Sequence, residues 1–389
     1  MPLVLPPLSL YIHIPWCVKK CPYCDFNSHE NSQQKSPPEA EYLNALKQDL
    51  IQDKHWAQGR KLRSIFFGGG TPSLVAAKTI GGILEYAEQV IGFEPDIEIT
   101  LEANPGTFEQ EKFSDYRQAG INRLSIGVQS FQEKHLNKLG RIHSSQEATK
   151  AISAAKKVGF DNINIDLMHG LPEQSVDEAL DDLKTAIALE PTHLSWYQLT
   201  IEPNTVFYRQ PPPLPADDTL ADIQDAGLQL LAQHGYKQYE VSAFCRDQTV
   251  SQHNVNYWSF GDYIGIGAGA HGKVTDLKKQ AIIRRQKTRL PEHYLNSEGA
   301  PSFKETLVDN TELPLEFLMN ALRLNDGVPS EYFIERTGLS LTVINKPLNE
   351  LIQKGLLEYT DNKLKASDLG QRFLNTILST FIDHQSDCI

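Results

Sequence analysis

The sequence predicts an α/β fold, a partial (β/α)6 barrel followed by a smaller, mainly helical domain. Short runs rich in β-branched and aromatic residues alternate with helical periodicity between residues 8 and 199. Six strand–helix units in a row favour a parallel sheet, and they are too few for a closed eight-fold barrel. From about residue 312 the pattern becomes helical, which indicates the second domain.

The expected elements follow from these two periodicities. Strands are expected at residues 8–14, 64–67, 97–101, 123–128, 162–167 and 193–199. Helices are expected between them, at residues 38–56, 75–90, 110–119, 145–158 and 176–189. A proline-rich spacer, a helix and an edge strand follow at residues 210–215, 220–234 and 238–243.

The last part of the chain resembles a winged helix. Helical stretches and two short alternating runs are expected at residues 315–324, 330–336, 341–354, 356–359 and 363–366. Residues 311–376 carry seven Lys or Arg and nine Asp or Glu, so packing or a protein partner is favoured over duplex DNA. We therefore expect a core at residues 1–240, a connecting segment at 241–310 and a helical C-terminal domain at 311–389.

Composition limits the class of protein. The chain has 389 residues, 40% of them apolar, and a net charge of −12, which allows a sizeable core and argues against nucleic-acid binding. No apolar run approaches the ~20 residues that span a bilayer, and the first ten residues lack the features of a signal peptide. Five cysteines, three of them within eight residues, indicate metal ligation in a reducing cytoplasm.

The main chemical signal is the CxxxCxxC motif of Cys17, Cys21 and Cys24, placed directly after the first expected strand. Three thiolates bind three irons of a 4Fe–4S cluster and leave the fourth iron open to a small ligand. An open iron can chelate the amino and carboxylate groups of S-adenosylmethionine. The alternative is a zinc knuckle, with His13 or His29 as the fourth ligand.

Polar residues at the ends of the next strands predict a ligand site beside this motif. The GGGTP sequence at residues 68–72 allows close backbone approach and offers a row of free N–H groups. Glu102 and Gln129 end two successive strands and Asp166 lies near the end of the next, and such ends meet at the carboxyl face of a parallel sheet. Arg141 follows; its guanidinium suits a carboxylate, although a surface salt bridge is the alternative. Each polar residue alone could merely cap a helix.

These motifs resemble those of the radical-SAM superfamily. Within it, YIHIPWC, CPYCDF, LEANPG, GVQSF, GRIH and DLMHGLP are similar to oxygen-independent coproporphyrinogen III oxidase and its haem-chaperone branch. The resemblance implies a 4Fe–4S cluster on the three motif cysteines. It also implies contacts to S-adenosylmethionine from Tyr11, Gly69, Gly70, Thr71, Glu102, Gln129, Arg141 and Asp166, with Tyr23 near a second such molecule.

Two features favour the chaperone branch over the oxidase. Phe26 stands where the oxidase has a further cysteine, and the segment before the first strand is short. The chaperone branch also has an HNxxYW motif, present here at residues 253–258. A neutral imidazole of His253 suits haem iron, and Tyr257 and Trp258 offer flat faces to a macrocycle. The alternative is an ordinary polar residue beside a core tryptophan.

Other residues near this motif have weaker signals. The basic stretch at residues 284–289 suits haem propionates or, alternatively, forms a solvated loop. His271 is a second candidate haem ligand. Cys245 and Cys388 lie far from the cluster motif and are expected to be incidental thiols.

The leading hypothesis is therefore a haem chaperone that binds haem and transfers it to recipient haemoproteins. The cluster and S-adenosylmethionine would serve assembly, gating or release. Two alternatives stay open: coproporphyrinogen III dehydrogenation, and radical methyl transfer to another small molecule. We expect no nucleic-acid partner, and the sequence leaves open a homodimer and peripheral membrane contact.

Overall fold

One large mixed sheet organises the protein. The computed structural model describes residues 1–30, 37–297, 302–360 and 362–386. Within them, twelve strands follow the order β14-β13-β12-β11-β1-β4-β5-β6-β7-β8-β10-β9. Its central strands are β1 (Leu8–Ile14), β4 (Leu62–Gly69), β5 (Phe93–Ala103), β6 (Arg123–Gln129), β7 (Asn162–His169) and β8 (His193–Gln198). These six neighbours pair in parallel, as an open partial barrel requires.

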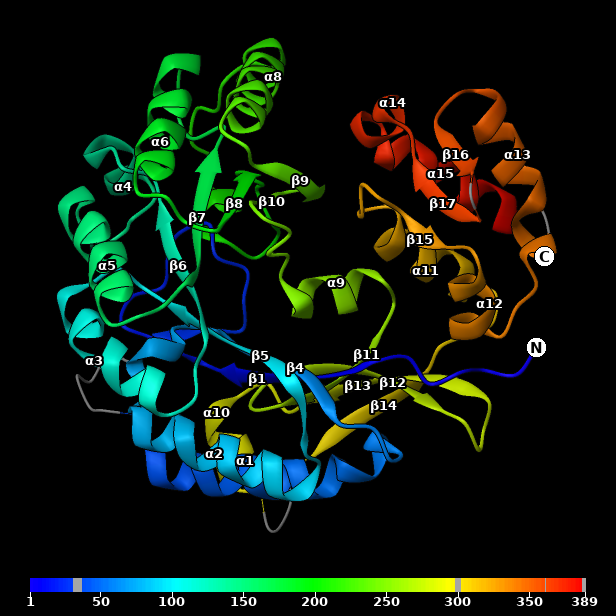
Figure 1. Ribbon diagram of the computed structural model, residues 1–389, viewed down its shortest axis with the longest axis horizontal. Coiled ribbons are helices and arrows are strands. Elements are labelled where there is room, and N and C mark those ends of the chain that lie inside the picture. Colours follow the sequence, from blue (N-terminus) through cyan, green and yellow to red (C-terminus); the bar gives the residue numbers. More distant parts are fainter. Residues whose placement is uncertain (31–36, 298–301, 361, 387–389) are drawn as a thin grey trace.

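Helices cover the outer face of the curved sheet (Figure 1). They are α1 (Glu39–Asp53), α2 (Ala77–Val90), α3 (Thr107–Gln118), α5 (Ser145–Lys157), α6 (Val176–Ala188) and α8 (Asp217–Gln233). Capping boxes at Ser144 and Ser175 start α5 and α6, because each serine exchanges hydrogen bonds with a glutamate three residues later. The helix between each pair of strands returns the chain so that the next strand runs parallel.

Both edges of the sheet extend beyond the six central strands. At one edge lie β9 (Lys237–Glu240) and β10 (Ala243–Cys245). At the other, β11 (Asp262–Ile266) pairs in parallel with β1, and β12 (His271–Asp276), β13 (Ala281–Lys287) and β14 (Phe303–Leu307) continue antiparallel. Residues 241–310, expected as a connecting segment, thus contribute five strands to the sheet.

The C-terminal part has the arrangement of a winged helix. Its elements are α11 (Leu313–Ala321), β15 (Val328–Pro329), α12 (Glu331–Thr337), α13 (Asn345–Gln353), β16 (Leu357–Thr360), β17 (Lys363–Ala366), α14 (Asp368–Arg372) and α15 (Leu374–Ser386). Three of these strands form a small sheet in the order β15-β17-β16. The N-terminal segment joins this domain, because Leu3 packs into its core and the Val4 N–H donates to Glu335 at 2.8 Å.

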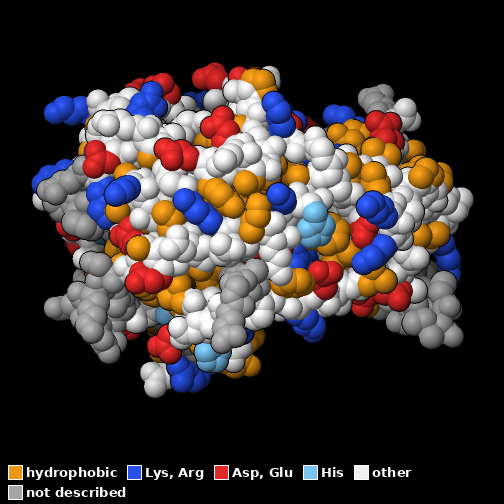
Figure 2. Space-filling view, turned by 90° about the horizontal axis from the view of Figure 1, so that it is seen from below, with side chains coloured by type: hydrophobic (Ala, Val, Ile, Leu, Met, Phe, Trp, Pro, Cys, Tyr) orange, Lys and Arg blue, Asp and Glu red, His pale blue; other side chains and the backbone are white. Residues whose placement is uncertain are grey.

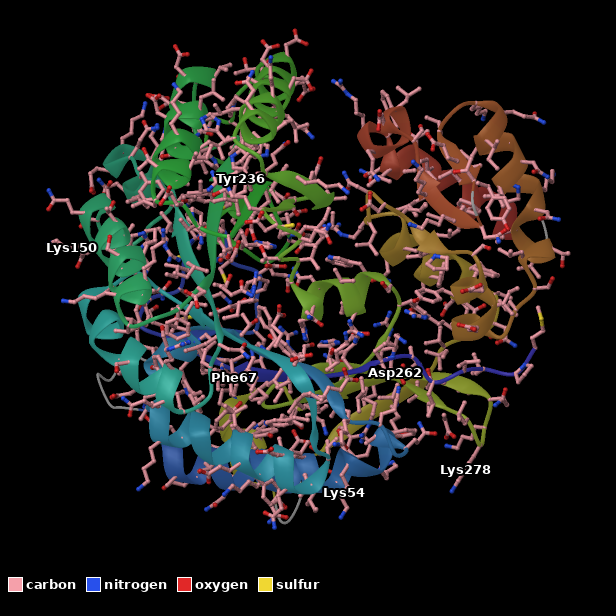
Figure 3. The ribbon with its side chains drawn as sticks, in the orientation of Figure 1. Lys54, Phe67, Lys150, Tyr236, Asp262 and Lys278 are labelled. Atoms are coloured by element: carbon pink, nitrogen blue, oxygen red, sulfur yellow. The ribbon has the colours of Figure 1, made fainter. Side chains whose placement is uncertain are left out.

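The short helix α9 (Gln252–Trp258) lies between the curved sheet and the C-terminal domain (Figure 1). Nearby, the fully buried Asp262 lies where the sheet meets that domain (Figure 3). Its carboxylate accepts hydrogen bonds from Arg60 at 2.9 Å and Lys273 at 3.1 Å. Within the described residues, no helix combines the length and apolar character needed to cross a membrane.

Candidate functional site

A cavity of about 350 Å³ opens at the carboxyl ends of the central strands, and the three motif cysteines line it. Cys17 ends β2 (Trp16–Cys17), Cys21 and Cys24 lie on the loop that leads from it to β3 (His29–Glu30), and none of the three is in a disulfide. Each sulfur has a hydrogen-bonding neighbour: Thr71 Oγ1 at 3.5 Å from Cys17, Ser28 Oγ at 3.6 Å from Cys24, and Arg141 Nη1 at 3.7 Å from Cys21. Three free thiols facing one space fit three irons of a cubane.

The two histidines near this loop are engaged elsewhere. His13 Nδ1 lies 3.0 Å from the Tyr11 hydroxyl, and His13 Nε2 lies 2.9 Å from the Asn27 carbonyl. His29 Nε2 lies 3.3 Å from Asn27 Oδ1. Both imidazoles therefore have hydrogen-bond partners other than the motif cysteines.

The glycine loop at residues 68–72 needs its glycines for steric reasons. Gly69 has a φ of +113°, and a Cβ there would lie 2.5 Å from the His13 ring. A Cβ on Gly70 would lie 2.5 Å from the Trp16 carbonyl oxygen. Any larger residue would therefore push the loop away from the cysteine segment.

The backbone N–H groups of this loop are not free, which corrects the sequence-based expectation. Gly69 N–H donates to Glu102 Oε2 at 3.2 Å. The next two N–H groups donate to the carbonyls of Ile14 and Trp16, each at 2.7 Å. The N–H groups of Gly70 and Thr71 are already bonded to β1 and β2. The loop can therefore contact a ligand through its Cα atoms and the Thr71 side chain.

Glu102, Gln129 and Asp166 all line the first cavity, as expected for residues at strand ends. Burial and the nearby Asp166 raise the pKa of Glu102 to about 8. Burial also raises the pKa of Asp166, which accepts hydrogen bonds from Ser125 at 2.9 Å and Asn164 at 2.7 Å. The Ser125 bond joins β6 to β7 and the Asn164 bond lies within β7, so helix capping does not explain Asp166.

Arg141 reaches into the same cavity and is not part of a surface salt bridge. Its Nη2 donates to Asn104 Oδ1 and to the Gly127 carbonyl, both at 2.7 Å. Tyr23 also lines this cavity, whereas Tyr11 lines a second one. The structure thus gathers the predicted S-adenosylmethionine residues around one space, with the exception of Tyr11.

A second cavity of about 750 Å³ adjoins the first. His253, Tyr257 and Trp258 line it, together with His271 and Arg289. Five residues stand in the walls of both cavities: Phe26, Gly69, Glu102, Asn254 and Trp258. A ligand in the second cavity would therefore lie directly beside the cysteine loop.

His253 is a neutral imidazole in an aromatic environment. Its ring centroid lies 4.9 Å from that of Phe66 and 6.4 Å from that of Tyr11. Burial and then the charge of Arg123 lower the pKa of His253 to about 3. Because Nδ1 lies 3.3 Å from Ser64 Oγ, Nε2 is the ring nitrogen left for a metal.

Trp258 serves both cavities and the domain contact. It packs against the C-terminal core, and the Arg323 guanidinium lies 4.2 Å from its ring centroid. The Tyr257 ring meets it edge-on, with centroids 4.9 Å apart. The ring is thus a packing anchor and part of the cavity wall at the same time.

The basic stretch on β13 differs from the sequence-based expectation. Arg285 and Lys287 are buried and pair with Asp53 and Asp49 of α1, so they are neither solvated nor free for propionates. Arg284 pairs with a glutamate of α11. Within this stretch, Arg289 is the basic residue that lines the second cavity. The reason is that β13 is an interior strand, so its inward basic side chains need buried acidic partners.

Comparisons with known proteins agree with this arrangement. The Radical SAM superfamily model matches residues 11–186, and the HemN C-terminal domain model matches residues 308–373. The chain is 50% identical to the haem chaperone HemW of Escherichia coli over 378 residues, which cover 97% of this chain and 99% of that one. It is 34% identical to HemW of Bacillus subtilis over 384 residues, covering 96% and 99%. The chain belongs to the HemW family.

This HemW-family chain also shares its fold with coproporphyrinogen III oxidase, HemN, from Escherichia coli. The two structures have a TM-score of 0.78 at 24% identity, over 97% of this chain and 90% of the other. Membership of the radical SAM superfamily implies a 4Fe–4S cluster and S-adenosylmethionine. The structural similarity to HemN confirms the predicted fold, a partial barrel followed by a C-terminal domain.

Several site residues of this HemW-family protein were missed by sequence reasoning. Asn27 ties the cysteine loop to the second cavity wall, donating to the Ala268 carbonyl at 3.0 Å and the Arg289 carbonyl at 2.9 Å. Asn104 holds Arg141, and Arg323 brings the C-terminal domain to the first cavity. Only Asn104 had a signal, since it lies in the LEANPG motif at a strand end.

The remaining predicted features lie away from the cavities. Cys245 is buried on β10 and lines neither cavity, and Cys388 lies outside the described residues.

Basic and acidic side chains are interspersed on the face seen in Figure 2. That face therefore offers no broad basic surface to a nucleic acid.

Proposed function

We propose that this protein binds haem in the second cavity and transfers it to recipient haemoproteins. The observation that carries the proposal is the cavity itself: about 750 Å³, lined by His253, Tyr257 and Trp258, directly beside the cysteine loop. Its volume falls in the range of cofactor pockets. Relatives of up to 50% identity over nearly the full length are named haem chaperones, which supports the same function here.

In this proposal His253 ligates haem iron through Nε2, and the rings of Tyr257 and Trp258 contact the macrocycle. The low pKa of His253 keeps the imidazole neutral and able to bind a metal. Arg289 is placed to meet a propionate, because it lines the cavity and is exposed. His271 lines the same cavity and is the alternative ligand.

Cys17, Cys21 and Cys24 hold the 4Fe–4S cluster, which supplies one-electron chemistry and an open iron. Around it, Arg141 offers a guanidinium to a carboxylate, and Glu102 and Asp166 offer carboxyl groups to a cation. Further contacts to S-adenosylmethionine come from the lining residues Tyr23, Gly69, Gly70, Thr71 and Gln129. Tyr11 lines the second cavity instead. Glu102 lines both cavities and so connects the wall that contains Tyr11 with this set of residues.

The proposal also assigns roles to the three parts of the chain. Residues 1–240 bind the cluster and S-adenosylmethionine, residues 241–310 carry the haem motif, and residues 311–389 cover the site. The cytoplasm suits the cysteines that the structure describes, because all of them are free thiols. Peripheral membrane contact and a homodimer would serve delivery of haem.

The test is a haem titration of anaerobically reconstituted protein, followed by transfer to an apo-haemoprotein. We expect wild type to bind and pass on haem, and His253→Ala to bind it at least tenfold more weakly. His271→Ala is the matched control, since it changes the other histidine of the same wall. Unchanged affinity of His253→Ala would remove this residue as the ligand.

A second assay separates the chaperone from the oxidase. The same protein is supplied with reductant, S-adenosylmethionine and coproporphyrinogen III, and protoporphyrinogen is quantified. We expect none, because Phe26 occupies the place of the oxidase's further cysteine. Stoichiometric protoporphyrinogen would overturn the chaperone proposal, and a methylated product would point to methyl transfer instead.

A further inference from the structure

The floor of the barrel is polar, although barrel interiors are commonly filled by branched apolar side chains. Each of six inward-facing residues lies on a different central strand, and all six are buried: Ser9, Ser64, Glu98, Arg123, Asn164 and His193. The pairing places Ser9 opposite Ser64, and Ser64 opposite Glu98. Burying such groups is costly unless each is hydrogen-bonded, so their partners show what the floor holds.

The floor holds the first turn of α9. The Glu98 carboxylate accepts the backbone N–H of His253 at 3.1 Å and that of Gln252 at 3.0 Å. It also lies 3.4 Å from Ser251 Oγ and 3.9 Å from Arg123 Nε. One carboxylate on β5 thus fixes the backbone on which the candidate haem ligand is mounted.

The floor also holds the ring of His253. Ser64 Oγ lies 3.3 Å from Nδ1, and Ser9 Oγ lies 2.7 Å from Ser64 Oγ. The Asn256 side chain, one turn further along α9, donates to Ser9 Oγ at 2.8 Å. The hydroxyl pair therefore joins the imidazole to its own helix through two strands.

The Ser9–Ser64 hydroxyl pair can accept the proton that iron binding places on the imidazole. A metal on Nε2 requires the proton on Nδ1, and Nδ1–H then donates to Ser64 Oγ. Ser64 can in turn donate its own proton to Ser9, which also accepts from Asn256. An alanine at residue 64 would remove this partner of Nδ1 and leave the ring orientation to packing alone.

We propose that Ser64 and Glu98 are positioning residues for haem binding: Glu98 fixes the first turn of α9, and Ser64 keeps the His253 ring in the orientation that presents Nε2 to the second cavity. This rests on the proposed haem ligation by His253. It adds two residues outside the recognised motifs, on strands that the haem motif does not include.

The test compares Ser64→Ala and Glu98→Gln with matched controls elsewhere in the barrel. Ser130 and Asp182 form a similar buried pair, with Ser130 Oγ 2.7 Å from Asp182 Oδ2 and the Phe131 N–H 2.7 Å from Oδ1. Ser130→Ala and Asp182→Asn therefore remove comparable bonds far from α9. Haem affinity and the haem optical and EPR spectra are measured, with circular dichroism as the folding check.

We expect Ser64→Ala and Glu98→Gln to weaken haem binding about tenfold. Their spectra should shift toward that of His253→Ala, and the two control variants should bind haem like wild type. In the His253→Ala background, Ser64→Ala should cause no further loss, because its effect acts through that ring.

Two results would overturn the positioning role while leaving haem binding intact. One is a wild-type spectrum and affinity in both Ser64→Ala and Glu98→Gln. The other is a full additional loss when Ser64→Ala is combined with His253→Ala. If His253→Ala itself binds haem like wild type, the ligand assignment fails first and the positioning role fails with it.

Discussion

The two adjoining cavities are built in different ways. Carboxylates, amides, two guanidinium groups and three thiols line the first, and most of them come from strand ends and the cysteine loop. Aromatic rings and imidazoles dominate the second, and most of them come from α9 and from the strands β1, β4, β11 and β12. The first therefore suits directional, charged contacts to a small ligand, and the second suits contact over a broad flat surface. Substitutions in the first cavity and in the second cavity should therefore impair ligand binding in different ways.

The largest expected effect is on the first cavity. Replacing Cys17, Cys21 and Cys24 together with alanine should abolish cluster binding, because no other described thiol lines the cavity. Iron and sulfide content after reconstitution is the measurement. Cys245→Ala is the control and should bind a full cluster. If the triple variant also loses all haem binding, the two cavities are not separate sites.

The second effect distinguishes Lys287 on β13, which stabilises the fold, from Arg289 just after β13, which is proposed to bind haem. Lys287→Met should lower the free energy of unfolding by about 3–5 kcal/mol, because it leaves Asp49 and Asp53 buried without their shared partner. Arg289→Met should change it by less than about 0.5 kcal/mol, since this side chain is exposed. Urea unfolding measures both. Equal losses would contradict the distinction.

The third effect concerns the shared wall. Phe26 is 59% exposed and lines both cavities, so Phe26→Ala should remove an apolar contact to haem and weaken its binding by about fivefold to tenfold. Val18→Ala is the control, because Val18 is 50% exposed in the same loop and lines neither cavity. Parallel haem titrations compare the two. An equal loss in Val18→Ala would mean that the loop, and not the ring, is responsible.

A smaller effect should follow pH in the first cavity. The pKa of Glu102 is about 8, so the carboxyl must lose a proton when a cationic ligand binds below that pH. S-adenosylmethionine affinity should thus rise with pH up to about 8, by at most about tenfold per unit, and then level off. Calorimetry across pH measures this. Glu102→Gln should remove this part of the pH dependence, and an unchanged profile would exclude Glu102.

The second cavity should show almost no pH effect from its ligand. The pKa of His253 is about 3, so the imidazole stays neutral between pH 5 and 8 and its metal-binding form does not change. Haem affinity measured over that range should be flat within about twofold. Burial and then the charges of Arg284 and Arg289 lower the pKa of His271, so a fall in affinity toward acidic pH that His271→Ala abolishes would instead identify His271 as the ligand.

The contrast also explains which parts could be predicted from the sequence. Glu102, Gln129 and Asp166 lie at or near the carboxyl ends of successive parallel strands, and that position brings them together. Among the strands that were not predicted, β12 follows a glycine-rich run and β13 carries basic side chains that are buried. The burial of these basic side chains depends on Asp49 and Asp53, which lie over 200 residues away in the sequence and therefore give no local signal.

Orientation was less predictable than location. The N–H groups of the glycine loop were expected to be free, but β1 and β2 bind two of them and Glu102 binds a third. Tyr11 lies on a predicted strand, yet its side chain faces the second cavity and hydrogen-bonds to His13. Such details depend on side-chain packing between strands, which periodicity does not describe.

The buried charged residues between α1 and β13 should restrict which substitutions occur at these positions in homologues. Asp49 and Asp53 carry two negative charges, and Arg285 and Lys287 carry two positive charges, at four buried positions. A change at one position leaves a charge stranded in the interior, so lineages that lose one should lose or reverse its partner as well. In an alignment of homologues these four positions should therefore covary as a unit, independently of haem and of the cluster.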